Sequence, residues 1–139
     1  MSYRKLFIVS NFLLVVSFAW AFLKDFNAKT AAQAGEAFAR LADTLIRSLH
    51  GAIEQNVIRQ HGRVAGQEIA ILALGKLGGR EMTATSDLDL VVLYDFDPEG
   101  GDSDGARPLD PTVYFGRLTQ RLISALTVPT RRGTLYAVD

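Results

Sequence analysis

The spacing of hydrophobic residues predicts one long amphipathic helix in the first half of the chain. Apolar residues recur every three or four positions from about Thr30 to His61, as one stripe of Phe38, Leu41, Leu45, Leu49, Ile53 and Val57. Thr30 and Gln33 are expected to form a capping box at the start of this helix, and Gly62 is expected to be the glycine that ends it. A continuous helix of this length would run about 46 Å, so we expect a break near Gly51. Four charged residues off the stripe are expected to face solvent: Arg40, Arg47, Glu54 and Arg59.

Two shorter apolar runs, residues 69–74 and 87–94, predict strands on either side of a glycine-rich turn. Alternate side chains of a strand share a face, so Asp87 and Asp89 point the same way, about 7 Å apart along the backbone. Leu88 between them points into the core. Two carboxylates beside a turn with free backbone N–H groups suit a divalent metal and a phosphate chain.

The two motifs together are stronger evidence for a functional site than either motif alone. By itself, Asp-x-Asp would be explained by a solvated strand edge, and the glycine pair by an ordinary turn. Two like charges about 4 Å apart repel by about 4 kcal/mol at an effective dielectric near 20, which a bound cation would offset. The better-known phosphate loops do not fit. A P-loop would have glycine in place of Ala70 and a hydroxyl residue in place of Leu77, and the glycine spacing differs from the dinucleotide fingerprint.

The C-terminal half predicts a loop, a helix and a final strand. The acidic, glycine-rich residues 95–110 do not follow the EF-hand pattern, which favours a mobile, solvated loop over a calcium site. Asp110 and Pro111 are an N-cap and a first-turn proline. The helix that follows has a buried stripe of Phe115, Leu118, Leu122 and Leu126. A turn at residues 131–133 leads to a strand over Leu135–Asp139.

Composition excludes several classes of protein. The chain has 139 residues, enough for one small domain, with 15 basic and 15 acidic residues. Zero net charge gives no electrostatic case for a nucleic-acid partner. The absence of cysteine excludes a disulfide scaffold and a zinc ribbon. His50 and His61 have no companion ligands, so we interpret them as surface or capping histidines.

The N-terminal segment Leu6–Leu23 is almost wholly apolar and follows Arg4 and Lys5. Its flanks and the small residues Ala19 and Ala21 are typical of a secretory signal or a membrane anchor. A helix buried in a larger parent enzyme and a non-native start are the alternatives. Export would separate the domain from cytosolic ATP, so we expect a cytoplasmic location and leave membrane association open.

Four blocks of the sequence resemble the nucleotidyltransferase core of glutamine synthetase adenylyltransferases: Gly75–Glu81 (GKLGGRE), Ser86–Leu90 (SDLDL), Tyr114–Leu122 (YFGRLTQRL) and Gly133–Asp139 (GTLYAVD). The resemblance covers roughly residues 31–139. Enzymes of this family are bifunctional: one half transfers AMP from ATP to a tyrosine of glutamine synthetase, and the other removes it phosphorolytically. Residues Arg80–Thr83 and Leu118–Ile123 are closer to the C-terminal, adenylylating half, although the direction stays open.

The resemblance implies an α/β fold, a nucleotidyltransferase-like mixed sheet with flanking helices, and the hydrophobic pattern places an apolar helix and a long amphipathic helix before it. The expected parts are an apolar segment (1–24), a helical lead-in (25–66) and a nucleotidyltransferase core that is incomplete at its C-terminus (67–139). In the family an Arg-Leu-Arg-Pro stretch follows the third carboxylate, and it is absent here. The alternative function is therefore a catalytically inactive remnant, membrane-tethered or not, that at most binds Mg-ATP.

The resemblance also implies a site. Asp87, Asp89 and a third carboxylate, Asp139, would hold Mg²⁺ and position ATP for in-line attack by a tyrosine hydroxyl. Asp139 would hold the attacking-side metal or accept the hydroxyl proton. The implied nucleotide contacts are Gly75, Lys76, Gly78, Gly79 and Ser86. Ser86 is first expected to cap a turn, and Arg80 is either a triphosphate clamp or a surface charge. The implied partners are glutamine synthetase and, for a full-length enzyme, a regulatory signalling protein of the nitrogen system.

Overall fold

The computed structural model describes residues 3–130, 133–134 and 136–139, and their side chains from Ser17 onward except at 130 and 133. The elements in chain order are α1 (Tyr3–His61), β1 (Glu68–Ala73), α2 (Gly75–Gly78), β2 (Leu90–Asp95), α3 (Pro111–Leu126), β3 (Pro129–Thr130) and β4 (Gly133–Thr134). Strands β1 and β2 form one two-stranded antiparallel sheet, and β3 and β4 form another. The fold therefore combines helices with small antiparallel sheets, consistent with the expected α/β class.

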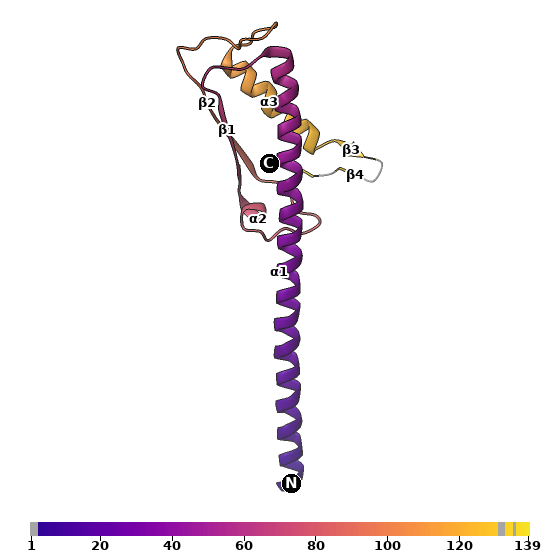
Figure 1. The fold of residues 1–139 in the computed structure, drawn as a ribbon. Helices are drawn as coiled ribbons and strands as arrows, with labels where there is room; N and C mark the ends of the chain where they lie inside the picture. Colours follow the sequence, from indigo (N-terminus) through magenta and orange to yellow (C-terminus); the bar gives the residue numbers. More distant parts are fainter. Residues whose placement is uncertain (1–2, 131–132, 135) are drawn as a thin grey trace.

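Helix α1 is continuous over 59 residues, and the other elements lie beside its C-terminal half (Figure 1). The expected break at Gly51 is wrong: the helix passes through this position without interruption and extends beyond the sheet. Thr30 lies inside the helix, where its hydroxyl donates to the Phe26 carbonyl at 2.9 Å, so the expected capping box is wrong as well. Gly62 does end the helix: its φ is 77°, and its N–H donates to the Ile58 carbonyl at 2.8 Å.

The buried face of α1 is rotated from the predicted stripe. Val57 is buried, and Leu49 and Ile53 pack against the core, but Phe38 and Leu41 are exposed. Small residues take the buried positions nearer the N-terminus: Gly35, Ala39 and Ala42, followed by Ile46. These small residues are buried because the turn after α2 approaches α1 closely at this point. The stripe was thus predicted correctly only toward its C-terminal end.

The sheet β1–β2 separates two faces of the domain. Ala73 pairs with Leu90, and Ile71 pairs with Val92. Ile71 and Leu90 pack against the core, whereas Leu72 and Leu93 on the opposite face are exposed. The second apolar run was expected to form a strand from residue 87, but β2 begins at Leu90. Residues 87–89 form their own parallel bridge, which belongs to the candidate site described below.

Helix α3 follows the sequence prediction closely. The Asp110 carboxylate accepts hydrogen bonds from the N–H groups of Thr112 and Val113, at 2.9 and 3.3 Å, and Pro111 occupies the first turn. The predicted stripe is buried, together with Tyr114: Phe115, Leu118, Leu122 and Leu126. Burial raises the pKa of the Tyr114 hydroxyl, which donates to the Gly62 carbonyl at 3.2 Å. This contact ties α3 to the end of α1.

The acidic loop after β2 is anchored to the C-terminal end of α1. The Asp104 and Gly105 N–H groups donate to the carbonyls of Arg63 and His61, both at 3.0 Å. Ser103 is buried, and its hydroxyl accepts from the Leu109 N–H at 3.0 Å, so this part of the loop is not solvated as expected. His61 is also buried, with Nδ1 2.8 Å from the Arg107 carbonyl. It lies in the last turn of α1, but it is not the surface histidine that the sequence suggested.

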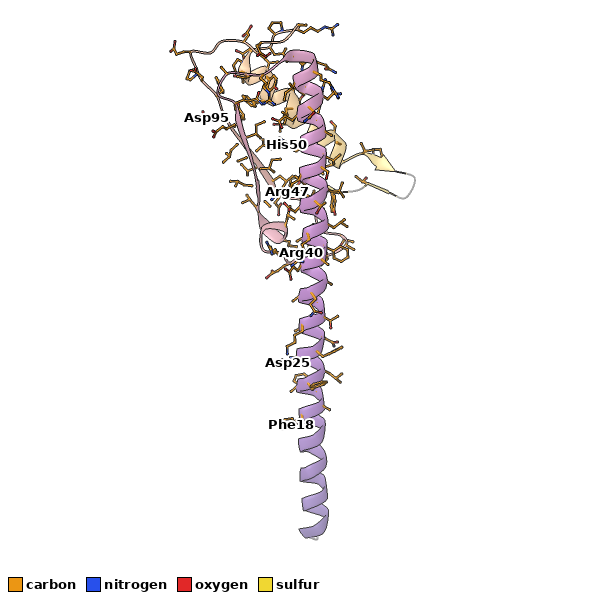
Figure 2. The ribbon with its side chains drawn as sticks, viewed as in Figure 1. Phe18, Asp25, Arg40, Arg47, His50 and Asp95 are labelled. Atoms are coloured by element: carbon orange, nitrogen blue, oxygen red, sulfur yellow. The ribbon has the colours of Figure 1, made fainter. Side chains whose placement is uncertain are left out.

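The apolar segment Leu6–Leu23 forms the start of α1. Within it the side chains up to Val16 lie outside the described residues, so the signal, anchor and non-native-start interpretations are not tested there. Over the part of the chain that is described, no helix combines the length and apolarity needed to cross a bilayer. Phe18, Trp20 and Phe22 are exposed on the half of α1 that extends past the sheet (Figure 2).

Candidate functional site

The glycine-rich segment after β1 folds into a single helical turn, α2, that is closed by its own backbone. The N–H groups of Gly79 and Glu81 donate to the carbonyls of Gly75 and Lys76, at 3.0 and 2.8 Å. The Leu74 N–H donates to the Asp89 carbonyl at 2.9 Å. The turn is therefore held both by itself and by the segment that carries the first two carboxylates.

Gly75 lies directly against the Asp89 carboxylate. Its φ is 52°, a conformation that favours glycine. A Cβ at Gly75 would overlap Oδ2 of Asp89 and lie 3.1 Å from its Cγ. The absence of a side chain at Gly75 is thus what lets the Asp89 carboxylate rest on the backbone of the turn.

The C-terminal residues pair in parallel with the segment around Leu88. The Leu88 N–H donates to the Ala137 carbonyl at 2.9 Å, and the Asp139 N–H donates to the Leu88 carbonyl at 3.1 Å. Leu88 therefore bridges Val138, and the residues that flank each of them share the opposite face. This register places Asp139 beside Asp89 on the face that also carries Asp87.

The three carboxylates share a face without being gathered around a common point. Asp87 and Asp139 are exposed, and Asp89 is half-buried. Among the described residues, no three acidic or histidine side chains stand close enough together to hold a metal ion. Carboxylate oxygens are nevertheless the donors that Mg²⁺ prefers, and exposed side chains can change rotamer. The donor chemistry and the shared face therefore fit a magnesium site.

Ser86 closes the turn that precedes Asp87. Its hydroxyl oxygen accepts from the Thr83 N–H at 2.9 Å, and its own N–H donates to the Thr83 carbonyl at 3.2 Å. The side chain is buried, as a turn-closing residue requires. The expected capping role is thereby confirmed, and this turn fixes where the carboxylate segment begins.

The two basic residues of the glycine-rich segment differ in their contacts. Lys76 is exposed on the turn, and Arg80 lies toward α1, with Nη1 3.5 Å from Glu36 Oε1. Arg40 donates to the same Glu36 oxygen at 2.7 Å, and this hydrogen bond, followed by the charge of Arg40, lowers the pKa of Glu36. Arg80 has a φ of 58°, so its backbone makes a sharp turn at this point. Its side chain is thus paired with Glu36 of α1.

Gly35 is a positioning residue that the sequence did not single out. It is buried on α1, where a Cβ would lie 3.2 Å from the Arg80 carbonyl oxygen and 3.3 Å from both Glu81 Cα and the Met82 carbonyl oxygen. All three atoms belong to backbone, which cannot swing aside as a side chain can. An isolated glycine inside a helical pattern is the signal that indicates such an approach.

Substitution of Gly35 by alanine is expected to destabilise the fold by about 1–3 kcal/mol, because the added methyl group must push the turn away from α1. The comparison is Gly51→Ala on the same helix, where no neighbouring atom of the described residues lies within 4 Å. That variant should be neutral or stabilising, since alanine favours helix more than glycine does. Urea unfolding measured by circular dichroism distinguishes them, and equal stability of the two variants would show that α1 and the turn are not packed this tightly.

Comparison with known proteins gives consistent matches. The family model of glutamate-ammonia ligase adenylyltransferase matches residues 14–139. The chain is 54% identical over 110 residues to the bifunctional glutamine synthetase adenylyltransferase/adenylyl-removing enzyme of a Bradyrhizobium species (strain ORS 278). It is 58% identical over 110 residues to the enzyme of that name from Xanthobacter autotrophicus, and 51% identical over 107 residues to the one from Brucella suis.

These matches cover most of the chain but little of each relative. The aligned region is 79% of the chain for the Bradyrhizobium enzyme, 78% for the Xanthobacter enzyme and 77% for the Brucella enzyme. In all three cases it is 11% of the relative. The family match begins at residue 14, inside the apolar segment Leu6–Leu23.

Proposed function

The chain belongs to the glutamate-ammonia ligase adenylyltransferase family, and from that premise we propose that it carries a nucleotidyltransferase site acting on a tyrosine of glutamine synthetase. The register that places Asp139 beside Asp89, on the face of Asp87, is the observation that supports this most directly. It gives three carboxylates next to a glycine turn, the arrangement that a nucleotidyltransferase-like fold needs. The reaction uses ATP and regulates nitrogen assimilation in the cytoplasm.

The chemistry follows from the roles of the three carboxylates. Asp87, Asp89 and Asp139 would hold Mg²⁺, which supplies positive charge to the triphosphate. Asp139 accepts the proton of the tyrosine hydroxyl, whose oxygen then bonds to the α-phosphorus of ATP. The bond from that phosphorus to the bridging oxygen breaks, and pyrophosphate leaves. In the removal reaction, a phosphate oxygen bonds to the phosphorus of tyrosyl-AMP, the bond from that phosphorus to the tyrosine oxygen breaks, and ADP and the free tyrosine hydroxyl are released.

The glycine turn is proposed to receive the phosphates. Gly75, Gly78 and Gly79 belong to the turn that lies against Asp89, and Lys76 is exposed on this turn and supplies charge to the triphosphate. Ser86 supports this arrangement through the turn before Asp87. In a full-length enzyme, a signalling protein of the nitrogen system is the proposed regulator.

Transfer of labelled AMP from ATP to purified glutamine synthetase tests this function. Asp87→Asn and Asp89→Asn are each expected to reduce labelling by about 10²-fold or more, the scale on which one charge-stabilising group acts. Asp102→Asn, an exposed acid of the loop after β2, should label like the unsubstituted chain.

If the unsubstituted chain labels no more than the Asp87→Asn, Asp89→Asn double variant, the chain is the inactive remnant. Calorimetric titration with Mg-ATP then determines whether it still binds nucleotide. The chain spans 11% of the length of each of these relatives.

A further inference from the structure

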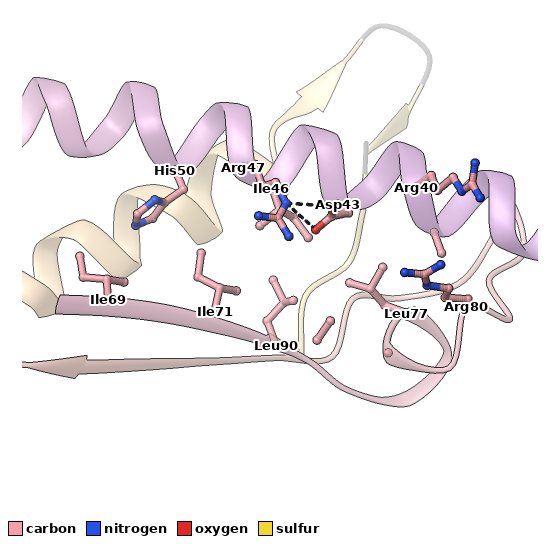
Figure 3. Close-up of a pocket in the computed structure, with 13 residues that line it drawn as sticks. Arg40, Asp43, Ile46, Arg47, His50, Ile69, Ile71, Leu77, Arg80 and Leu90 are labelled. Atoms are coloured by element: carbon pink, nitrogen blue, oxygen red, sulfur yellow. Dashed lines mark hydrogen bonds and ion pairs between the residues drawn. The ribbon is translucent and has the colours of Figure 1, made fainter.

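A cavity lies between α1 and the sheet β1–β2, on the face of the sheet that carries Ile71 and Leu90. Its volume is about 470 Å³, within the range of small-molecule pockets, and it is partly open to solvent (Figure 3). The floor is apolar and comes mainly from Ile69, Ile71 and Leu90, with Leu77 of the glycine turn at one end. Of the proposed nucleotide contacts, Gly78 of the glycine turn lines this space, whereas the three carboxylates do not.

Charged and polar groups of α1 line the wall opposite this floor. His50 faces the sheet, and its Nε2 is shielded from solvent without a hydrogen-bond partner among the described residues. Arg47, three residues earlier, lies on the same helix face. Its Nε donates to both Asp43 carboxylate oxygens at 2.9 Å, so this contact occupies Nε and orients the guanidinium group. A polar pair on α1, His50 and Arg47, thus lies opposite the apolar floor of the cavity.

We propose that this pocket binds a small organic monocarboxylate with an apolar chain. The carboxylate accepts hydrogen bonds from His50 Nε2 and from the Nη groups of Arg47, which gives the buried imidazole nitrogen the partner it lacks. The chain lies over Ile69, Ile71 and Leu90, where it is removed from water. Three arginines and one acid, Asp43, line the pocket, and Glu36 pairs with two of these arginines, Arg40 and Arg80. One positive charge is left in excess among these five groups, which favours a single negative group on the ligand.

The pocket and the proposed nucleotidyltransferase site share one structural element. Leu77 and Gly78 of α2 line the pocket, while Gly75 of the same turn lies against the Asp89 carboxylate on the other side. The binding proposal does not rest on AMP transfer. It is measured without ATP or glutamine synthetase, so the failure of either proposal leaves the other intact.

Isothermal titration calorimetry of the chain with sodium octanoate tests the proposal, with octan-1-ol as the uncharged probe of equal chain length. Octanoate is expected to bind at one site, with a Kd at least tenfold lower than that of octanol. Arg47→Gln should raise the Kd for octanoate about tenfold, as the loss of one charge-assisted contact does. Because the Arg47 side chain is 78% exposed, this substitution leaves the core intact.

Two further variants make the result specific to this pocket. Arg59→Gln removes an exposed arginine of the same helix that lies outside the pocket lining, and it should leave the Kd unchanged. His50→Leu should weaken octanoate without weakening octanol. Octanoate binding no tighter than octanol, or equal effects of Arg47→Gln and Arg59→Gln, would overturn the proposal.

Discussion

Replacement of Gly75 by alanine is expected to reduce AMP transfer by about 10²-fold or more, because the Asp89 carboxylate must leave its place. The substitution has two effects on the turn. Alanine at a φ of 52° costs about 1–2 kcal/mol relative to glycine. The new methyl group also overlaps Oδ2 of Asp89, so either the turn or the carboxylate moves. We expect the free energy of unfolding to fall by about 1–3 kcal/mol, measured by urea denaturation.

Gly101→Ala separates these two effects. Gly101 has a φ of 69°, so alanine there carries a similar backbone cost, but within the described part of the chain no neighbouring atom lies within 4 Å. The Gly101 variant should lose stability without losing labelling of glutamine synthetase. If both variants label normally, the contact between Gly75 and Asp89 is not part of the reacting arrangement.

Local sequence signals predicted a structural feature correctly where a single side chain or glycine determines it. Asp110 and Pro111 start α3 through their own side chains, and Gly62 ends α1 through its positive φ. The hydrophobic spacing of α3 also predicted its buried face correctly, because this helix packs its large side chains against the core. Ser86 acts on a residue only three positions away. The helix caps and the Ser86 turn therefore do not depend on distant parts of the chain.

Features that depend on distant contacts were predicted less well. The buried face of α1 is set by the close approach of Arg80 and Met82 to Gly35, and hydrophobic spacing favoured the larger Phe38 and Leu41 instead. His61 is buried by a loop that arrives more than 40 residues later, at Arg107. A pattern within one helix does not contain this information.

The candidate site combines both cases. The shared face of Asp87 and Asp89 was predicted from strand alternation, and the burial of Leu88 agrees with it. The position of Asp139 came only from family resemblance, because no local signal determines which strand pairs with which. The structure pairs Val138 with Leu88 in parallel, which supplies a physical reason for that position. The pocket beside His50 had no sequence signal, since its walls come from separate elements.

Leu88→Ala is expected to lower the free energy of unfolding by about 2–5 kcal/mol, the range for a buried leucine. Leu88 is 0% exposed and belongs to the core cluster that includes Ile46, Leu122 and Leu126. It also lies between Asp87 and Asp89 and bridges Val138, so the cavity forms at the point where all three carboxylates are held. Stability of a domain is about 5–15 kcal/mol, so this loss is a large part of it.

The matched control is Leu93→Ala, on the opposite face of the sheet. Leu93 is 50% exposed, so its truncation should change stability by no more than about 0.5 kcal/mol. Urea unfolding measures the stability of both variants. Amide hydrogen exchange at positions 88 and 139 should accelerate in Leu88→Ala alone, because the N–H groups of these two positions form the parallel bridge. Equal destabilisation by the two variants would mean that Leu88 does not anchor the carboxylate segment in the core.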